Sequence, residues 1–344
     1  VHAKPSASFT YTSAACLPTN GLVQFTYNGS LSPGQVYAWN FGDPGSGALN
    51  TSALQNPTHN YSSPGNYTLT VTVTNANGCV DDSVINTNFS IKPALAYPAL
   101  TAVCESVTGT VSVATASVTN GIPGTGEYHG PATTLTGNFT PSLAGAGTHT
   151  IWYVFTATGN CKDSVSRTIV VYAKPFASFT YTSAACLPVT GLVQFTYNGS
   201  VSPGQTYAWN FGDPASGALN TSALQNPTHN YSNTGNHALT LTVTNTNGCV
   251  DDSVTNAVFS VKPALSFTAL TAVCESVIGT VSVANASVTN GVTGTGVYHG
   301  PATNAAGLFT PSVAGAGNHT IWYVFTSTGN CKDSVSQVIN VKPK

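Results

Sequence analysis

Apolar and polar residues alternate along several short stretches of the chain, which is the pattern of half-buried β-strands. In residues 67–74, Tyr67, Leu69, Val71 and Val73 alternate with threonines. Residues 23–27, 37–41 and 151–155 alternate in the same way, and clusters of Gly and Pro separate the stretches. No window carries the apolar stripe and caps of an amphipathic helix. The pattern therefore predicts an all-β protein without helices.

The chain is one unit written twice, at a constant offset and without insertions. Cys16 recurs as Cys186, Trp39 as Trp209 and Trp152 as Trp322. Within each unit, Lys-Pro pairs end one apolar stretch before the next begins, at Lys4, Lys92, Lys174, Lys262 and Lys342. Proline fixes φ and removes a backbone donor, so each pair predicts a short joint between domains. We expect four immunoglobulin-like β-sandwiches in an elongated rod, at residues 1–93, 94–175, 176–263 and 264–344.

The composition excludes two classes of partner. Only 6% of the 344 residues are charged, and nine basic against eleven acidic residues give a net charge of -2. Such a chain has no cationic surface for nucleic acid, and no apolar run is long enough for membrane insertion. The sequence starts at Val1 and contains no methionine. We therefore interpret it as a mature fragment whose signal peptide lies outside the sequence.

Eight cysteines, four in each unit, predict an oxidising compartment outside the cytosol. No Cys-x-x-Cys motif occurs, and no His stands at ligand spacing from a Cys, which disfavours structural zinc. One disulfide per domain is the prediction, as a hypothesis about pairing. The predicted pairs are Cys16 with Cys79, Cys104 with Cys161, Cys186 with Cys249 and Cys274 with Cys331.

Three motifs in residues 1–93 resemble a known extracellular family. They are Trp-Asn-Phe-Gly-Asp at residues 39–43, Asn-Pro-Thr-His-Asn-Tyr at residues 56–61 and Pro-Gly-Asn-Tyr at residues 64–67. Together with the Thr/Val strand that follows, they resemble the PKD (polycystic kidney disease) domain, and the match repeats in residues 176–263. Pro44 and Pro214 replace a glycine of the family pattern, so the loop after Asp43 is expected to differ. The resemblance implies an immunoglobulin-like sandwich in tandem extracellular proteins.

The other two domains carry the segments Val-Cys-Glu at residues 103–105 and Gly-Asn-Cys at residues 159–161. They are similar to the Ig-like repeats beside PKD domains in large secreted surface proteins of Bacteroidota, including gliding and adhesion proteins. This resemblance implies a cell-surface location.

Candidate chemistry is sparse. Asp43 and Asp213, in the Phe-Gly-Asp turn, are weak Ca²⁺ candidates, with acceptance of backbone N–H bonds in the turn as the favoured role. His59 and His229 are expected to pack beside a turn. No nucleophile elbow and no phosphate loop is present, so we predict no catalytic residues, no metal and no cofactor.

Two further features concern functions at the protein surface. Asp-Ser-Val occurs once per domain and resembles the O-glycosylation acceptor of secreted Bacteroidota proteins, which marks Ser83, Ser164, Ser253 and Ser334 as candidates. The alternative is a serine that merely hydrogen-bonds a neighbouring turn. Exposed tryptophans would suit a sugar-binding platform, but all four lie in strongly apolar strands, which favours core packing.

These features predict a non-catalytic structural segment of an extracellular fibre or giant cell-surface adhesin. A chain with so little charge repels its copies weakly, so we expect it to associate with copies of itself or to carry sugar. The alternative is a carbohydrate-binding accessory array of a secreted polysaccharide-degrading enzyme, with surface glycans as partners. Enzymatic activity of the chain itself is the least favoured reading.

Overall fold

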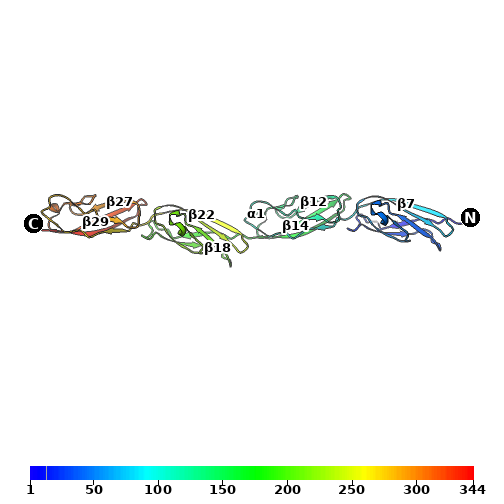
Figure 1. Ribbon diagram of the computed structural model, residues 1–344, viewed down its shortest axis with the longest axis horizontal. Helices are drawn as coiled ribbons and strands as arrows, with labels where there is room; N and C mark the ends of the chain where they lie inside the picture. Colours follow the sequence, from blue (N-terminus) through cyan, green and yellow to red (C-terminus); the bar gives the residue numbers. More distant parts are fainter. Residues whose placement is uncertain (13) are drawn as a thin grey trace. The chain divides into compact units, whose positions relative to one another are not determined.

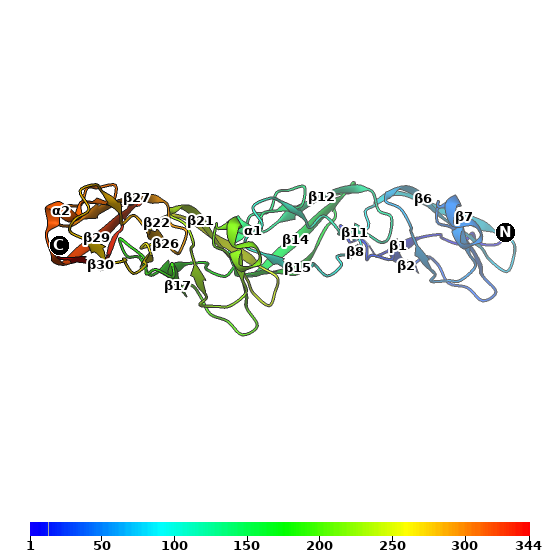
Figure 2. The ribbon, with the colours of Figure 1, turned by 60° about the vertical axis from the view of Figure 1, so that its left-hand side comes forward.

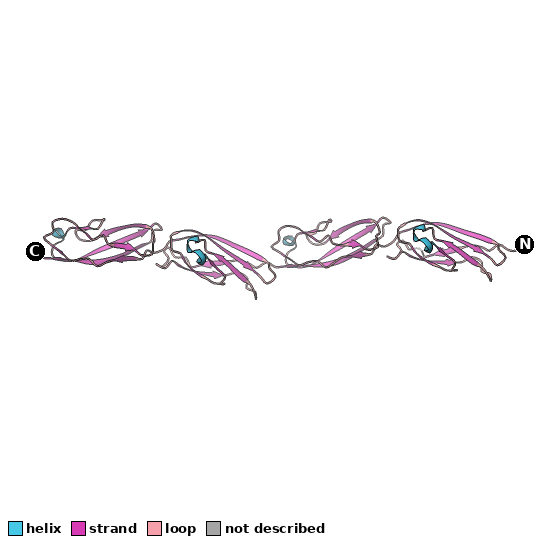
Figure 3. Cartoon of the chain, viewed as in Figure 1, coloured by secondary structure: helices cyan, strands magenta, loops and turns pink. Residues whose placement is uncertain are grey.

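The computed structural model describes residues 1–12 and 14–344. The chain forms two compact units, Val1–Ala173 and Lys174–Lys344, which repeat the same elements. Strands dominate both units, but each unit also has two short helical segments, so the prediction of a protein without helices is wrong (Figure 3). Segments of four to seven residues are too short to show an amphipathic stripe in the sequence. These segments are η1 (Pro44–Asn50), α1 (Pro141–Ala144), η2 (Pro214–Asn220) and α2 (Pro311–Ala314).

The first part of each unit is a sandwich of a three-stranded and a four-stranded antiparallel sheet. In the first unit the strand orders are β1-β2-β5 and β4-β3-β6-β7. The strands are β1 (Phe9–Tyr11), β2 (Leu22–Tyr27), β3 (Val36–Asn40), β4 (Thr51–Ser52), β5 (Thr58–Asn60), β6 (Gly65–Thr74) and β7 (Val80–Phe89). Their counterparts are β16 (Phe179–Tyr181), β17 (Leu192–Tyr197), β18 (Thr206–Asn210), β19 (Thr221–Ser222), β20 (Thr228–Asn230), β21 (Gly235–Thr244) and β22 (Val250–Phe259).

The second part of each unit is built on one long hairpin. In the first unit it gives the order β12-β14-β15-β9, with β9 parallel to β15, and the two-stranded sheets β8-β11 and β10-β13 lie beside it. The strands are β8 (Leu95–Ala96), β9 (Val103–Cys104), β10 (Val111–Ser112), β11 (Ser117–Val118), β12 (Gly124–His129), β13 (Asn138–Phe139), β14 (Gly147–Ala157) and β15 (Lys162–Tyr172). Figure 2 shows β12, β14 and β15 as neighbours.

The second unit repeats this sheet as β24-β30-β29-β27, with β23-β26 and β25-β28 as its two-stranded sheets. The strands are β23 (Leu265–Phe267), β24 (Val273–Cys274), β25 (Val281–Ser282), β26 (Ala286–Val288), β27 (Gly294–His299), β28 (Leu308–Phe309), β29 (Gly317–Ser327) and β30 (Lys332–Lys342). Figure 1 labels the long strands β14 and β29 of the two repeats.

The cores follow the alternation seen in the sequence. Leu69, Val71 and Val73 of β6 are fully buried, as are Val23 and Phe25 of β2 on the facing sheet. Apolar side chains at every second position meet between the two sheets because successive strand residues point to opposite faces. In each unit the buried residues of both parts form one contiguous cluster. The all-β sandwich prediction is therefore confirmed.

The expected domain boundaries at residues 93 and 263 coincide with a change of sheet. In the described part of the chain, the named sheets of each unit lie on one side or the other of these positions. Because the two parts share one apolar cluster, they pack against each other within a unit, and the division into four domains stays a prediction. No helix among the described residues is both long enough and apolar enough to cross a membrane.

Candidate functional site

A disulfide joins the two parts of each unit, and it is not the disulfide that the sequence predicted. Cys16 bonds Cys161 and Cys186 bonds Cys331, with α-carbons 5.7 Å apart in both pairs. The predicted pairing of Cys16 with Cys79 and of Cys104 with Cys161, and its repeat in the second unit, is therefore wrong.

Strand length explains why the predicted pairs do not form. The Leu17 amide donates to the carbonyl of Ser90, so Cys16 lies near the end of β7. Cys79 stands just before β7 begins, and the ten residues of β7 span about 30 Å at 3.3 Å per residue. Disulfide formation needs α-carbons within about 7 Å, so Cys79 is out of reach. Cys16 instead bonds Cys161, which the second part of the unit brings to the same end of the first sandwich.

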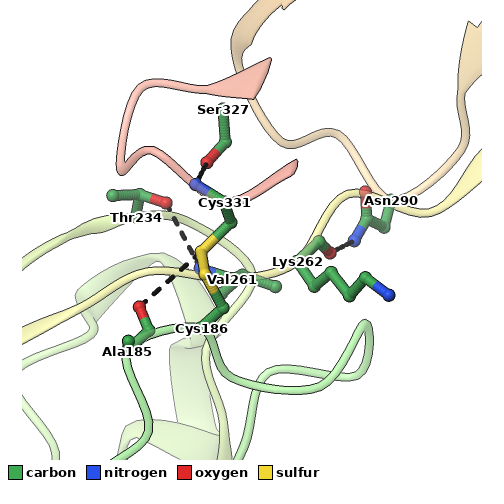
Figure 4. Close-up of a disulfide and its surroundings, with 8 residues drawn as sticks. All are labelled: Ala185, Cys186, Thr234, Val261, Lys262, Asn290, Ser327 and Cys331. Carbon is green, nitrogen blue, oxygen red and sulfur yellow. Dashed lines mark hydrogen bonds between the residues drawn. A yellow bond between two sulfur atoms is a disulfide. The ribbon is translucent and has the colours of Figure 1, made fainter. Parts of the chain in front are cut away.

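The partner cysteine lies in the turn of the long hairpin. Figure 4 shows this turn in the second unit, where it lies beside the segment that carries Cys186. In the second unit the Cys331 amide donates to Ser327 Oγ at 3.0 Å, and the cysteine is fully buried. A Cβ on Gly329 of this turn would lie 2.2 Å from Ser260 Oγ, so only glycine allows this approach. Gly159 stands in the same relation to Ser90 in the first unit.

An asparagine adds a hydrogen-bonded bridge beside the disulfide. The side-chain amide of Asn120 donates to the carbonyls of Lys92 and Thr19, both at 3.0 Å, and its Oδ1 accepts the Ala94 amide at 3.0 Å. Asn290 makes the equivalent bonds in the second unit, of which the bond to the Lys262 carbonyl is drawn in Figure 4. The Lys-Pro joint is thus fixed through its backbone, as an amide with both donors and an acceptor allows.

The lysines of the joints also form ion pairs with the aspartates that follow cysteines. Lys4 contacts Asp81 at 2.6 Å, Lys174 contacts Asp251 at 2.8 Å, and Lys262 contacts Asp333 at 3.5 Å. The Ala7 amide and the Lys4 ammonium hold the pKa of Asp81 below its usual value. Burial alone would raise the pKa of Asp251, but the Ala177 amide and Lys174 outweigh it and lower that pKa as well. The sequence showed these aspartates but not their partners.

The remaining four cysteines differ in state. Cys104 and Cys249 are disulfide-bonded. Cys79 and Cys274 are free thiols among the described residues, so the prediction that all eight cysteines are bonded is wrong for these two.

The aspartates proposed as weak Ca²⁺ candidates are bound to histidines. Asp43 Oδ2 lies 3.0 Å from His59 Nε2, and Asp213 lies at the same distance from His229, with all four side chains buried or nearly so. The expected packing of His59 beside a turn is present, since its ring stacks on Phe41 with centroids 4.5 Å apart. The aspartate partner was missed, because nothing in the local pattern links positions 16 apart.

These residues do not make a good Ca²⁺ site. Calcium takes six to eight oxygen ligands, whereas Asp43 offers one carboxylate whose Oδ2 already faces the imidazole. Within the described ranges, no three His, Cys, Asp or Glu side chains gather where they would hold a metal. Ca²⁺ binding at Asp43 or Asp213 is thus poorly supported by the donor set.

A shallow hollow of about 370 Å³ borders His59, and a similar one of about 310 Å³ borders His229. Its first-unit lining is Phe41, Leu49, Thr51, Ser52, Thr58, His59 and Asn60. The lining contains hydroxyl and amide groups but neither a carboxylate nor a cation. A general acid or base needs a titratable group aimed at a substrate, and His59 directs Nε2 to Asp43 instead.

The tryptophans divide into two pairs. Trp39 and Trp209 are buried, and each indole N–H donates to a backbone carbonyl at 2.8 Å. Trp152 and Trp322 are 46% and 45% exposed on the outer face of the hairpin, so the expectation of core packing is wrong for them. Ile151 and Tyr153 face the core instead, which leaves the residue between them on the other side of the strand.

The serines of the Asp-Ser-Val motif lie within long strands. Ser164 and Ser334 are exposed on β15 and β30, and the amide of each donates to the side chain of the preceding aspartate. Ser83 and Ser253 are half-buried on β7 and β22, the edge strands of their sheets. O-glycosylation at these four positions stays a prediction.

Comparison with known proteins supports the resemblance seen in the motifs. A family model described as PKD domain matches residues 2–89 and 173–260. No curated protein sequence matches the chain. Similar solved structures include the PKD1 domain of Vibrio anguillarum Epp (23% identity, TM-score 0.21, covering 26% of this chain and 96% of that one). Another is the PKD1 domain of the Vibrio cholerae metalloprotease PrtV (27%, 0.21, 26% and 99%).

A longer match is to a Ca²⁺-stabilised adhesin with which an Antarctic bacterium binds ice (12% identity, TM-score 0.31, covering 99% of this chain and 100% of that one). The family model alone covers just over half of the 344 residues, in two copies that coincide with the two seven-stranded sandwiches. The chain therefore belongs to the PKD domain family.

Proposed function

We propose that the chain is a non-catalytic structural segment of an extracellular fibre or large cell-surface adhesin. The observation that carries this proposal is the joint inside each unit, where a disulfide, an asparagine bridge and a shared apolar cluster fasten two sandwiches together. Fixing the angle between two domains serves stiffness and spacing, because adjacent domains move relative to each other unless the interface holds them.

Three further observations support this role. The disulfides suit an oxidising compartment outside the cytosol. The second unit reproduces the joint of the first, as expected for a segment whose purpose is repetition. With only 6% charged residues, copies repel each other weakly, which favours association with copies of the chain.

Electron microscopy of native material tests the proposal. Strands of ten or eleven residues at about 3.3 Å per residue give roughly 35 to 40 Å per sandwich and thus roughly 70 to 80 Å per unit. We expect filaments with an axial repeat of about that length or a simple multiple of it. Dispersed particles without any repeat, together with turnover of a substrate by the purified chain, would overturn the structural role.

A second function is favoured by one observation, the exposure of Trp152 and Trp322. Each lies opposite a histidine of the neighbouring strand, Trp152 opposite His129 and Trp322 opposite His299. A flat exposed indole can stack on the apolar face of a sugar ring, while the hydroxyl groups of the sugar remain free to form hydrogen bonds. The chain would then bind surface glycans as part of a secreted, polysaccharide-directed protein.

Glycan binding has its own test. The double variant W152A/W322A is compared with the unmodified chain and with the control L143A/V313A, whose exposed apolar side chains lie in α1 and α2. Loss of binding on a glycan array in the tryptophan variant alone supports this second function. Absence of binding by the unmodified chain removes it.

A further inference from the structure

The two free thiols stand at positions where the repeat carries bonded cysteines. Cys79 is the counterpart of Cys249, and Cys274 is the counterpart of Cys104. Cys249 and Cys104 are disulfide-bonded, whereas Cys79 and Cys274 are free. Cys249 is fully buried while Cys79 is partly exposed, and Cys104 is partly exposed while Cys274 is exposed. At each of these two repeat positions, one copy of the cysteine is therefore disulfide-bonded and the other is a free thiol.

Cys79 lies beside the start of the chain. Its Sγ is 4.0 Å from the carbonyl oxygen of His2, and the side-chain amide of Asn75 donates to the Ala3 carbonyl at 2.9 Å. The Lys4 ammonium is bound to Asp81, two residues after the cysteine. The free thiol and the first residues thus occupy the same end of the first sandwich.

Cys274 lies beside the end of the chain. It pairs with Lys342 in the parallel register of β24 and β30, and the Glu275 amide donates to the Lys342 carbonyl at 2.9 Å. Lys342 is the last residue of the final strand. The second free thiol is therefore next to the point at which the chain leaves its last sheet.

The same contacts recur around the bonded cysteines in the middle of the chain. Tyr172 pairs with Cys104 as Lys342 pairs with Cys274. Two residues further on, Lys174 is bound to Asp251, as Lys4 is bound to Asp81. Cys104 thus stands in the same strand register as Cys274, and Cys249 is followed by an aspartate in the same kind of ion pair as the one that follows Cys79.

The surface around Cys79 suits a docking domain. A hollow of about 410 Å³ is formed by residues 3–5, 30–33 and 75–77, the last of which stands two residues before the cysteine. Apart from Lys4, which Asp81 neutralises, the lining is uncharged. A neutral, partly apolar hollow admits a second protein surface without separating charges from water.

We propose that Cys274 of one copy forms a disulfide with Cys79 of a second copy, so that copies join end to start. Each thiol loses a proton, the two sulfurs bond, and the two electrons reduce a donor disulfide, such as that of a dithiol oxidoreductase, to two thiols. This inference deepens the proposed structural role and rests on it, since it supplies a covalent link between successive segments.

Two single variants test the bond. C79S retains only the Cys274 thiol and C274S only the Cys79 thiol, and neither change touches the bonded cysteines. In a glutathione redox buffer the unmodified chain is expected to give a ladder of multimers on non-reducing gels, which reduction collapses. Each variant alone stays monomeric. Their equimolar mixture gives about tenfold more dimer than either variant alone and no larger species, because one thiol remains on each partner.

Peptide mapping of the dimer must show Cys79 linked to Cys274. The proposal is overturned if either variant alone forms as much dimer as the mixture. It is also overturned by a Cys79–Cys79 link or by the absence of any ladder from the unmodified chain. Reduction of native material that leaves a polypeptide longer than this chain places the bond between repeats of one chain and overturns joining between copies. Regular filaments formed by the double variant C79S/C274S would leave the structural role intact while removing the covalent link from it.

Discussion

His59 Nε2 lies 3.0 Å from Asp43 Oδ2, and the same two atoms are 3.0 Å apart in the second unit between His229 and Asp213. The Tyr61 hydroxyl donates to the Phe41 carbonyl at 2.9 Å beside this pair, and burial raises the pKa of Tyr61 well above its usual value. The histidine–aspartate pair therefore belongs to the closed interior of the sandwich.

Breaking this pair is expected to destabilise the fold. H59A leaves the buried carboxylate of Asp43 without its partner, so we expect a loss of about 3 kcal/mol in the free energy of unfolding. D43N costs less, because an amide oxygen still accepts a bond from the imidazole. Chemical denaturation of H59A, D43N and the double variant measures both effects and their coupling. A double variant whose loss equals the sum of the two single losses would show that the pair is not coupled.

Removal of the Cys16–Cys161 disulfide is expected to loosen the first unit. The bond closes a separation of 145 residues, for which the chain-entropy model gives about 5 kcal/mol. The variant C16S/C161S should unfold at a markedly lower temperature and be cleaved faster by protease near Lys92. C79S is the matched control, because Cys79 carries no disulfide in this chain. Equal melting temperatures for the two variants would contradict the prediction.

Substitutions of Asn120 test whether its donated hydrogen bonds, and not only its volume, stabilise the first unit. N120A loses three hydrogen bonds, and N120D keeps the acceptor for the Ala94 amide but points carboxylate oxygen at two carbonyls. Each lost bond is worth about 1 kcal/mol, and facing acceptors add repulsion. N120D should therefore be less stable than N120A, which thermal unfolding would show. The reverse order would mean that the donated bonds contribute little.

His237 is expected to lower the stability of the second unit. Its Nδ1 lies 3.0 Å from the Gly212 carbonyl oxygen, but its Nε2 is buried without a hydrogen-bond partner among the described residues. In the first unit Tyr67 occupies this position, and its hydroxyl donates to the Ser63 carbonyl at 2.6 Å. H237Y is expected to stabilise the second unit by about 1 kcal/mol, and Y67H to destabilise the first by a similar amount. Calorimetry of both variants checks the two signs.

Acid sensitivity should depend on the ion pair at the chain start. The folded-state pKa of Asp81 lies below its unfolded value of about 3.9, so its contribution to stability is present above that pH. The contribution is lost as the pH falls through the lowered pKa. D81N should therefore melt below the unmodified chain at pH 7, and the two should converge at about pH 2. D82N, at an exposed neighbour, is the control and should show no such convergence.

Local patterns in the sequence located several strands of the first unit, among them β2, β3, β6 and β14. The alternation at residues 67–74 places Leu69, Val71 and Val73 in the core, because the period of two in a strand fixes which side chains share a face. The PKD motifs likewise identified the two sandwiches that the family model matches. The prediction of core packing was wrong for Trp152, because both faces of its strand are apolar in sequence and the period of two does not say which face is buried.

Periodicity, the constant offset and the cysteine content are properties of the chain alone, so they were enough to predict the all-β class, the duplication and the presence of disulfides. The bond between Cys16 and Cys161, the contact between Asp43 and His59 and the exposure of Trp152 follow from the folded arrangement and could not be inferred from local patterns. The disulfide depends on how the two parts of the unit pack, the Asp43–His59 contact on how β5 meets the turn after β3, and the exposure of Trp152 on which face of its sheet covers the core. A disulfide forms where α-carbons meet within about 7 Å, and spacing along the sequence does not specify that distance.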